Sequence, residues 1–153
     1  MLLALLLAQA TATANLVDAN NKPVGTAKLT QTPHGVLIAV ELHDLKPGIH
    51  AIHLHETGKC EAPAFKTAGG HFNPGKKQHG FMTADGAHAG DMPNLDVPAD
   101  GKLKAELLAG DATRVALLDA DGAAVVIHAK ADDYKSQPAG DAGDRVACGV
   151  IQK

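Results

Sequence analysis

The sequence contains no tryptophan, only one tyrosine and three phenylalanines, so aromatic side chains supply little of any core. It also lacks an excess of charge: the net charge is −3 and the pI is near 6.3. A basic surface for nucleic acid is therefore not indicated. No apolar run approaches the roughly 20 residues of a membrane-spanning helix. Neither nucleic acid nor a membrane is an expected partner, although 153 residues are enough for a self-sufficient core.

The beginning of the chain, MLLALLLAQATATA, is apolar and then rich in small residues. It resembles a secretory signal cleaved after Ala8, Ala10 or Ala12, except that no lysine or arginine precedes the apolar run. A shortened signal and a misplaced start codon both account for that departure. We therefore expect a signal segment over residues 1–10, a single domain over residues 11–153, and a periplasmic or secreted location.

Cysteine is scarce as well, with only Cys60 and Cys148. In an exported protein the two would pair. Such a bridge closes a loop of about ninety residues, for which the chain-entropy model gives about 4–5 kcal/mol. In a cytosolic protein the same residues would be two buried thiols. The export-like start favours the disulfide.

Hydrophobic alternation predicts strands. The stretch GVLIAVELH places Val36, Ile38, Val40 and Leu42 on one face. Shorter strand-like runs, separated by turn signals, lie at 14–18, 24–32, 50–55, 102–107, 115–118, 125–128 and 146–151. No segment combines a helix cap with apolar residues at a spacing of 3.6. The expected fold class is all-β, a sandwich or closed barrel of about eight strands.

Two stretches lack strand character, residues 56–96 and residues 129–144. Loops of this length are uncommon in compact domains and are usually functional or disordered. The first contains Cys60, His71, His79 and His88, and a disordered linker would not concentrate metal ligands in this way. We expect it to be ordered by what it binds.

Histidines cluster in GIHAIHLHE. His53 and His55 are two residues apart, so on a strand both rings lie on one face, whereas His50 lies on the other. Two imidazoles side by side on a rigid strand are half of a copper or zinc site. For this pair alone, two surface histidines on a polar face are an equally good interpretation.

The long loop and one later strand supply further ligands. The loop sequence GGHFNPGKKQHGFMTADGAHAGD supplies three imidazole nitrogens and one carboxylate as possible ligands. They form a tetrahedral zinc set: His71, His79, His88 and Asp91. His128, at the end of the strand VVIH, is a further donor for the His53–His55 pair. This accumulation favours a two-metal site over unrelated histidines and acids.

Six segments carry a resemblance to a known family: GIHAIHLHETGKC, GGHFNP, KQHG, HAGDMPNL, IHAKADDY and GDAGDRVACGVI. Together, and in the family's order, they resemble the copper,zinc superoxide dismutases over essentially all of residues 11–153. The resemblance implies an eight-stranded Greek-key barrel or sandwich with two long functional loops. It also implies an oxidoreductase that disproportionates superoxide to oxygen and hydrogen peroxide by Cu(II)/Cu(I) cycling. The alternative is a non-catalytic copper- and zinc-binding module on the same fold.

The resemblance also implies two ligand sets. The copper ligands would be four imidazoles: His53, His55, His71 and His128. The zinc ligands would be three imidazoles and a carboxylate: His71, His79, His88 and Asp91. The ring of His71 would be deprotonated and would bridge both metals, and in the reduced enzyme it would leave copper and accept a proton.

Further roles follow from the same resemblance. Asp132 would hydrogen-bond the far nitrogens of His53 and His79 and so fix both ring directions. Arg145, with His71 the other catalytic residue, would lie beside copper and attract and orient the superoxide anion. A bridge between Cys60 and Cys148 would hold the long loop against the barrel.

The remaining histidines have no ligand role. His50 would brace the fold from the other face, and His34 and His43, which match no motif, are expected to face solvent. No apolar patch can be assigned to an interface, so a homodimer and a monomer are both open.

The sequence also departs from the family pattern. Ala51 and Ile52 stand where a glycine and an aromatic residue are usual. The long gap EAPAFKTAGG before His71 resembles the bacterial branch. Ala139 occupies a position that is often threonine at the rim of the copper channel. Three lysines are candidates for steering the substrate: Lys76, Lys77 and Lys135.

Overall fold

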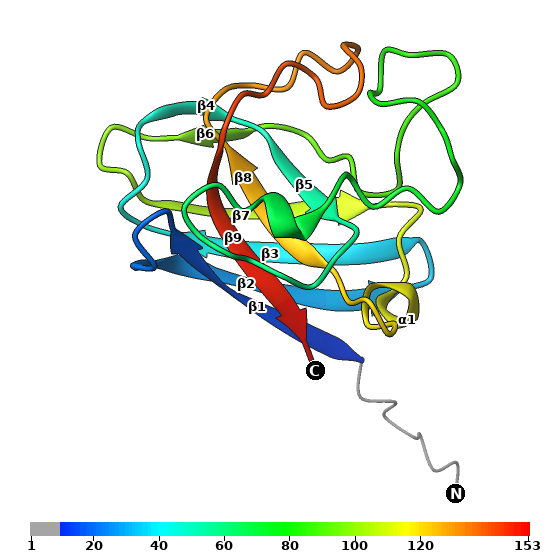
Figure 1. Ribbon diagram of the computed structural model, residues 1–153, viewed down its shortest axis with the longest axis horizontal. Helices are drawn as coiled ribbons and strands as arrows, with labels where there is room; N and C mark the ends of the chain where they lie inside the picture. The colour runs from blue at the N-terminus through cyan, green and yellow to red at the C-terminus, as the bar shows by residue number, and fades with distance from the viewer. Residues whose placement is uncertain (1–9) are drawn as a thin grey trace, which may run out of the picture.

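The computed structural model describes residues 10–153, and within them the chain is almost entirely strand and loop (Figure 1). The strands are β1 Thr11–Asp18, β2 Pro23–Thr32, β3 Gly35–Leu42, β4 Gly48–His50, β5 Ile52–His55, β6 Leu95–Val97, β7 Leu103–Ala109, β8 Ala124–His128 and β9 Arg145–Gln152. Two short helices accompany them, the 3-10 turn Lys66–Ala68 and α1 Arg114–Leu117. The expected signal segment, residues 1–10, lies outside the described residues apart from Ala10.

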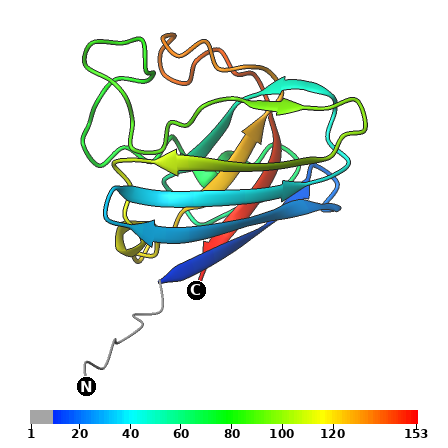
Figure 2. The same ribbon diagram turned by 180° about the vertical axis from the view of Figure 1, so that it is seen from behind.

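Seven strands form one antiparallel sheet in the order β5-β8-β9-β1-β2-β3-β7, and β4 pairs separately with β6. The sheet curls strongly, so that its two ends approach each other (Figure 2). Pairs such as β3 with β7 and β5 with β8 join strands that are far apart in the sequence. The all-β barrel or sandwich is confirmed.

The curled sheet encloses one main core. The predicted alternation of β3 is confirmed, since Val36, Ile38, Val40 and Leu42 are all buried there. Burying an aliphatic side chain of this size contributes about 1.5–3 kcal/mol. A second, smaller apolar cluster lies on the other face of β8 and β9, where residues of the long loop cover it: Phe65, Ala68, Ala124, Val126 and Cys148.

Two sequence predictions are wrong in detail. The run 115–118, expected to be a strand, lies mainly in α1, because the hydroxyl of Thr113 caps the turn by accepting from Ala116 N–H at 3.3 Å. Val115 is exposed and Leu117 is fully buried, which suits a single helical turn on the surface. The stretch 56–96, expected to contain no strand, ends in β6, whose partner is β4.

The later, bright green part of the first long loop, residues 56–94, and the second long loop, residues 129–144, lie side by side at one end of the sheet, away from the C-terminus (Figures 1 and 2). The earlier part of the first loop, with the 3-10 turn Lys66–Ala68, crosses the face of β8 and β9. Met82 N–H donates to Tyr134 O at 3.0 Å and joins the two loops. The predicted disulfide is confirmed: Cys60 in the first loop is bonded to Cys148 in β9. Among residues 10–153, no helix is long and apolar enough to cross a membrane.

Candidate metal centre

The candidate site forms along the outer edge of β5, the strand at one end of the sheet order. An edge strand has unpaired backbone groups, and here the first long loop satisfies them. Leu54 N–H donates to Gly90 O at 2.9 Å, and Phe72 N–H donates to Leu54 O at 2.8 Å. Isolated bridges then place His53 opposite Asp91 and His55 opposite His71. Backbone pairing therefore brings loop ligands beside strand ligands.

The first donor set consists of four buried imidazoles. One nitrogen from each ring lies within 4.8 Å of the others, in His53, His55, His71 and His128. Within the described chain these rings also hold the only buried side-chain nitrogen or oxygen atoms without a hydrogen-bond partner: His53 Nδ1, His55 Nε2, His71 Nε2 and His128 Nε2. Buried polar atoms are rarely left without a partner, so four in one place indicate a ligand.

Hydrogen bonds at the opposite ring nitrogens decide the tautomers. His53 Nε2 donates to Asp132 Oδ2 at 2.8 Å, and His55 Nδ1 donates to Gly69 O at 3.0 Å. His128 Nδ1 contacts Gly143 O at 3.4 Å. A neutral imidazole carries one N–H, so the other nitrogen of each ring presents a lone pair.

Burial keeps these rings neutral. It lowers the pKa of His53 to about 4 and that of His128 to about 3, and it lowers the pKa of His55 well below its usual value. A proton therefore does not occupy the lone pairs at neutral pH. Neutral imidazole nitrogens suit copper and zinc, so this set fits the metal that the sequence implied.

The second donor set surrounds one carboxylate oxygen. Asp91 Oδ1 lies 2.9 Å from His71 Nδ1, 3.0 Å from His79 Nδ1 and 3.4 Å from His88 Nδ1. His88 Nδ1 is also 3.2 Å from His71 Nδ1. Ligands at about 2.0 Å in a tetrahedron are separated by about 3.3 Å, so these distances match the edges of a zinc tetrahedron.

The hydrogen-bond partners of His79 in the second set favour a positive charge beside its ring. His79 Nε2 is 2.9 Å from Asp132 Oδ1, so a neutral His79 ring donates there and has no proton left on Nδ1. Burial lowers the pKa of His79, but its bonds to Asp132 and Asp91 outweigh burial and raise the pKa to about 9. A positive charge, from a proton or a metal ion, is therefore favoured between His79 and Asp91.

Asp91 is suited to that charge. Burial raises its pKa, but hydrogen bonds from His71 and His79 hold the pKa well below its usual range. Its Oδ2 accepts from the backbone N–H groups of Gly80 at 2.9 Å and His88 at 3.0 Å, which fixes the carboxylate. Burial lowers the pKa of His88, which favours its neutral form.

His71 belongs to both sets. Its Nδ1 faces Asp91, and its Nε2 is among the unpartnered nitrogens of the first set. The donors of His53 also lie within 4.8 Å of His71, His79 and Asp91. We assign His53 to the first set because its Nδ1 is one of the four unpartnered nitrogens, and we assign His88 to the second because it contacts Asp91 and His71 directly.

Asp132 joins the two sets from outside. Its Oδ2 accepts from His53 and its Oδ1 from His79, the pair of contacts that the resemblance implied. Burial raises the pKa of Asp132, but the hydrogen bonds from His53 and His79 hold it well below its usual range. One carboxylate therefore sets the ring direction in both sets.

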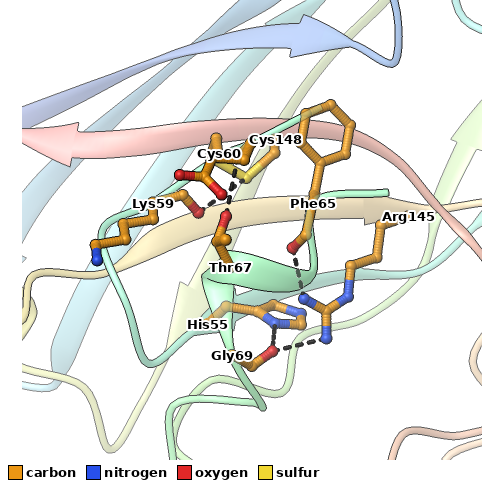
Figure 3. Close-up of a disulfide and its surroundings, with 9 residues drawn as sticks. His55, Lys59, Cys60, Phe65, Thr67, Gly69, Arg145 and Cys148 are labelled. Atoms are coloured by element: carbon orange, nitrogen blue, oxygen red, sulfur yellow. Dashed lines mark hydrogen bonds between the residues drawn. A yellow bond between two sulfur atoms is a disulfide. The ribbon is translucent and has the colours of Figure 1, made fainter. Parts of the chain in front are cut away.

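Arg145 lies next to the first set, at the start of β9. Its Nη1 donates to Phe65 O at 2.8 Å and its Nη2 donates to Gly69 O at 2.6 Å (Figure 3). The same Gly69 carbonyl accepts from His55 Nδ1, so one backbone oxygen orients both a donor ring and the guanidinium. None of the ion pairs among residues 10–153 involves Arg145. Burial lowers the pKa of Arg145. Its positive charge is not neutralised by a carboxylate.

The other three histidines belong to neither donor set. The ring nitrogens of His50 contact His128 O and Lys46 O, both at 2.7 Å, so the ring links two segments of backbone. His34 and His43 are exposed, as expected.

Sequence reasoning missed several residues around the site. Lys66 lines the same open cleft of about 660 Å³ as Arg145, whereas Lys77 pairs with Asp111 at 3.2 Å. Through their side-chain amides, Asn94 holds the backbone of Asp132 and Gln137 holds the backbone of His79. No local pattern marks these residues, because each partner is dozens of positions away in the chain.

Comparison with known proteins gives a consistent result. The protein-family model described as copper/zinc superoxide dismutase matches residues 23–151. The chain is 47% identical over 148 residues to the Cu-Zn superoxide dismutase of Caulobacter vibrioides, covering 92% of this chain and 85% of that protein.

Solved structures agree with the sequence matches. A superoxide dismutase-like protein from Bacillus subtilis has a TM-score of 0.86 at 39% identity, covering 90% of this chain and 96% of that one. The Cu/Zn superoxide dismutase from Brucella abortus has a TM-score of 0.80 at 30% identity, covering 94% of this chain and 100% of that one.

Proposed function

This chain belongs to the copper/zinc superoxide dismutase family, and we propose that its two donor sets hold one copper and one zinc ion beside Arg145. Its reaction is the disproportionation of two superoxide anions and two protons to oxygen and hydrogen peroxide. The observation that carries the metal assignment is the group of four buried nitrogens without partners, next to a carboxylate surrounded by three imidazoles.

The copper ligands in this proposal are the four imidazoles of the first set: His53, His55, His71 and His128. The zinc ligands are the members of the second set: His71, His79, His88 and Asp91. When bound, copper supplies a one-electron redox couple, while zinc, which is d¹⁰, supplies charge and structure only. The neutral rings of His53, His55 and His128 accept a cation with little rearrangement, because Asp132, Gly69 and Gly143 already hold their other nitrogens.

His71 has a second role in this proposal. Each peroxide formed consumes two protons, and His71 Nε2 can hold a proton whenever a metal does not occupy it. Its ring is kept in place from the other side, because Nδ1 faces Asp91 at 2.9 Å. In this proposal a protonated His71 Nε2 would supply one of these protons within the first donor set.

Arg145 binds and orients the anionic substrate. Two neutral carbonyls hold its guanidinium without cancelling its charge, so the anion meets a site that is already organised. Lys66 lines the same cleft as Arg145, together with the carboxylates of Asp18 and Asp144, so Lys66 favours encounter with an anion only through its local charge. This placement makes Lys66 a steering candidate beside Lys76, Lys77 and Lys135.

Metal analysis combined with a dismutation assay tests the proposal. One copper and one zinc per chain, with rapid turnover of superoxide by the loaded protein, is the expected result. Zinc alone after copper loading, or both metals without turnover, would instead support the non-catalytic metal-binding module. No comparison favours that alternative.

The disulfide supports a periplasmic or secreted location, because such bridges persist in oxidising compartments. N-terminal sequencing of the exported protein tests this location together with the expected signal segment 1–10 and domain 11–153. The expectation of a homodimer or a monomer stays a prediction for sedimentation equilibrium.

A further inference from the structure

His79 is held by its ring and by its backbone. Its ring nitrogens face Asp91 at 3.0 Å and Asp132 at 2.9 Å, and the residue is fully buried. It lies in the first long loop, outside every strand, so no sheet pairing fixes its peptide groups. Within the described residues, no backbone–backbone hydrogen bond outside helices and strands involves His79.

Side chains take the place of that pairing: Thr83 Oγ1 donates to His79 O at 2.8 Å, and the amide of Gln137 bonds both peptide groups of His79. His79 N–H donates to Gln137 Oε1 at 2.8 Å, and Gln137 Nε2 donates back to His79 O at 2.9 Å. Gln137 Nε2 also donates to Lys135 O at 2.9 Å, which fixes which end of the amide is the donor. Gln137 therefore imitates one step of a β-ladder across 58 residues of sequence.

The two loops fit tightly around this contact. Gly140 has a φ of +71°, and a Cβ there would overlap Asp132 Oδ1 and lie 2.7 Å from His79 Nε2. The second loop is thus packed directly on the His79 ring, and Gln137 fastens the His79 backbone to that loop. The position of the His79 ring between the carboxylates of Asp91 and Asp132 therefore depends on the position of the His79 backbone.

Asn94 makes the same two-sided contact with the backbone of Asp132 that Gln137 makes with His79. Asp132 N–H donates to Asn94 Oδ1 at 2.8 Å, and Asn94 Nδ2 donates to Asp132 O at 3.0 Å. Asn94 holds a carboxylate that serves both donor sets, whereas Gln137 holds a ring that belongs to the second set alone. Their effects on the two metals should therefore differ.

We propose that Gln137 is a positioning residue for the zinc site, acting through the backbone of His79. This inference rests on the proposed metal assignment. Losing Gln137 should lower zinc affinity about tenfold, the low end for residues that orient metal ligands, because Gln137 is exposed and water can replace part of its contact. Copper affinity should not change, since Gln137 touches no donor of the first set.

The test compares metal affinities of the full chain by chelator competition, for zinc and for copper separately. Gln137→Leu removes both hydrogen bonds to His79 and the one to Lys135, and Gln137→Ala is a second variant should leucine disturb folding. Gln137→Glu keeps an acceptor for His79 N–H and should recover most of the zinc affinity. Gln78→Leu is the matched control, because Gln78 precedes His79, is exposed and makes no side-chain hydrogen bond within the described residues.

A zinc-selective loss in Gln137→Leu, with recovery in Gln137→Glu, supports the inference. Unchanged zinc affinity, or equal losses of both metals without recovery, overturns it. If the unchanged protein itself binds no zinc, the metal assignment fails instead, so the two failures are distinguishable. Asn94→Leu gives the contrast: it should weaken both metals.

Discussion

The two halves of the proposed metal centre, the copper half and the zinc half, are built differently. In the copper half, His53, His55 and His128 lie on β5 and β8, inside the hydrogen-bonded sheet. In the zinc half, every donor lies between His71 and Asp91, in a loop. The sheet therefore positions most of one half, while the other half depends on side-chain contacts between loops.

The two halves also differ in the charge of their side chains. The copper half consists of neutral rings whose burial resists protonation. The zinc half contains the ionised Asp91, and there a proton on His79 is favoured. A site built on strands therefore keeps its donors in place without an ion, whereas a site built on a loop needs a positive charge to hold its donors together.

The largest expected effect is an opposite pH response of the two halves in metal-free protein. His53 and His128 have folded pKa values of about 4 and about 3, below the unfolded value of 6.5, so the unfolded chain takes up protons first as the pH falls. Stability should fall below pH 6.5 by about 1.4 kcal/mol per pH unit for each ring, or about 3 kcal/mol each by pH 4.

His79 should act in the other direction. Its folded pKa of about 9 lies above the unfolded value of 6.5, so its contribution is complete below pH 6.5 and is lost as the pH rises to 9. Urea unfolding of chelator-treated, disulfide-bonded protein from pH 4 to 9 should show a maximum near pH 6.5. Saturating zinc should remove the alkaline decline. A flat profile above pH 6.5 would refute the charge difference between the halves.

The second effect concerns the disulfide. Replacing Cys60 and Cys148 by serine should lower the free energy of unfolding by about 4 kcal/mol in the chain-entropy model. The bridge anchors the loop carbonyls of Phe65 and Gly69, which hold Arg145 and the ring of His55 (Figure 3). Copper affinity should therefore fall more than zinc affinity. Denaturant unfolding and separate chelator titrations measure both, and an equal fall would contradict this assignment.

Asp132→Asn should weaken metal binding in both halves at once. An amide cannot accept from both rings as the carboxylate does, so copper and zinc affinities should each fall about 10- to 100-fold. Asp133→Asn is the matched control, since the partners of Asp133 are Lys135 and Ser136. Metal competition assays decide the outcome. Loss of only one metal would show that Asp132 serves one half alone.

The smallest effect should come from charge beside the copper half. Arg145→Ala should lower the dismutation rate about tenfold at low salt, with copper retained, because a fixed charge near a site raises anion encounter. Lys66→Ala should act in the same direction but less. Lys104→Ala is the control, because Lys104 is exposed and pairs with Glu41. An unchanged rate for Arg145→Ala at low salt would remove Arg145 from the mechanism.

The sequence predicted the parts of the molecule that follow local periodicity. Alternation identified β3, and the spacing of His53 and His55 identified a shared face, because side chains on a strand repeat every two residues. The all-β fold class followed from alternation and turn signals, and the disulfide followed from the export-like start and the family resemblance. The zinc set and the donor role of His128 followed from residue types and spacing, whereas the sharing of His71 between the two sets and the role of Asp132 came from the resemblance.

What the sequence could not predict depends on long-range contacts. The run 115–118 has strand composition, but the Thr113 cap turns it into a helix. Gln137 and Asn94 resemble ordinary loop residues until their amides meet His79 and Asp132, 58 and 38 residues away. The position of Lys66 beside Arg145 likewise depends on how the first loop folds over β9.

The pairing of the first loop with the outer edge of β5 has a consequence for solubility. The carbonyl of Gly90 and the N–H of Phe72 occupy backbone groups of Leu54 that would otherwise be open to a strand from another molecule. If ion loss and reduction of the bridge together release the loop, that edge becomes a template for intermolecular β-pairing. Storage with zinc under oxidising conditions should therefore protect purified protein against aggregation.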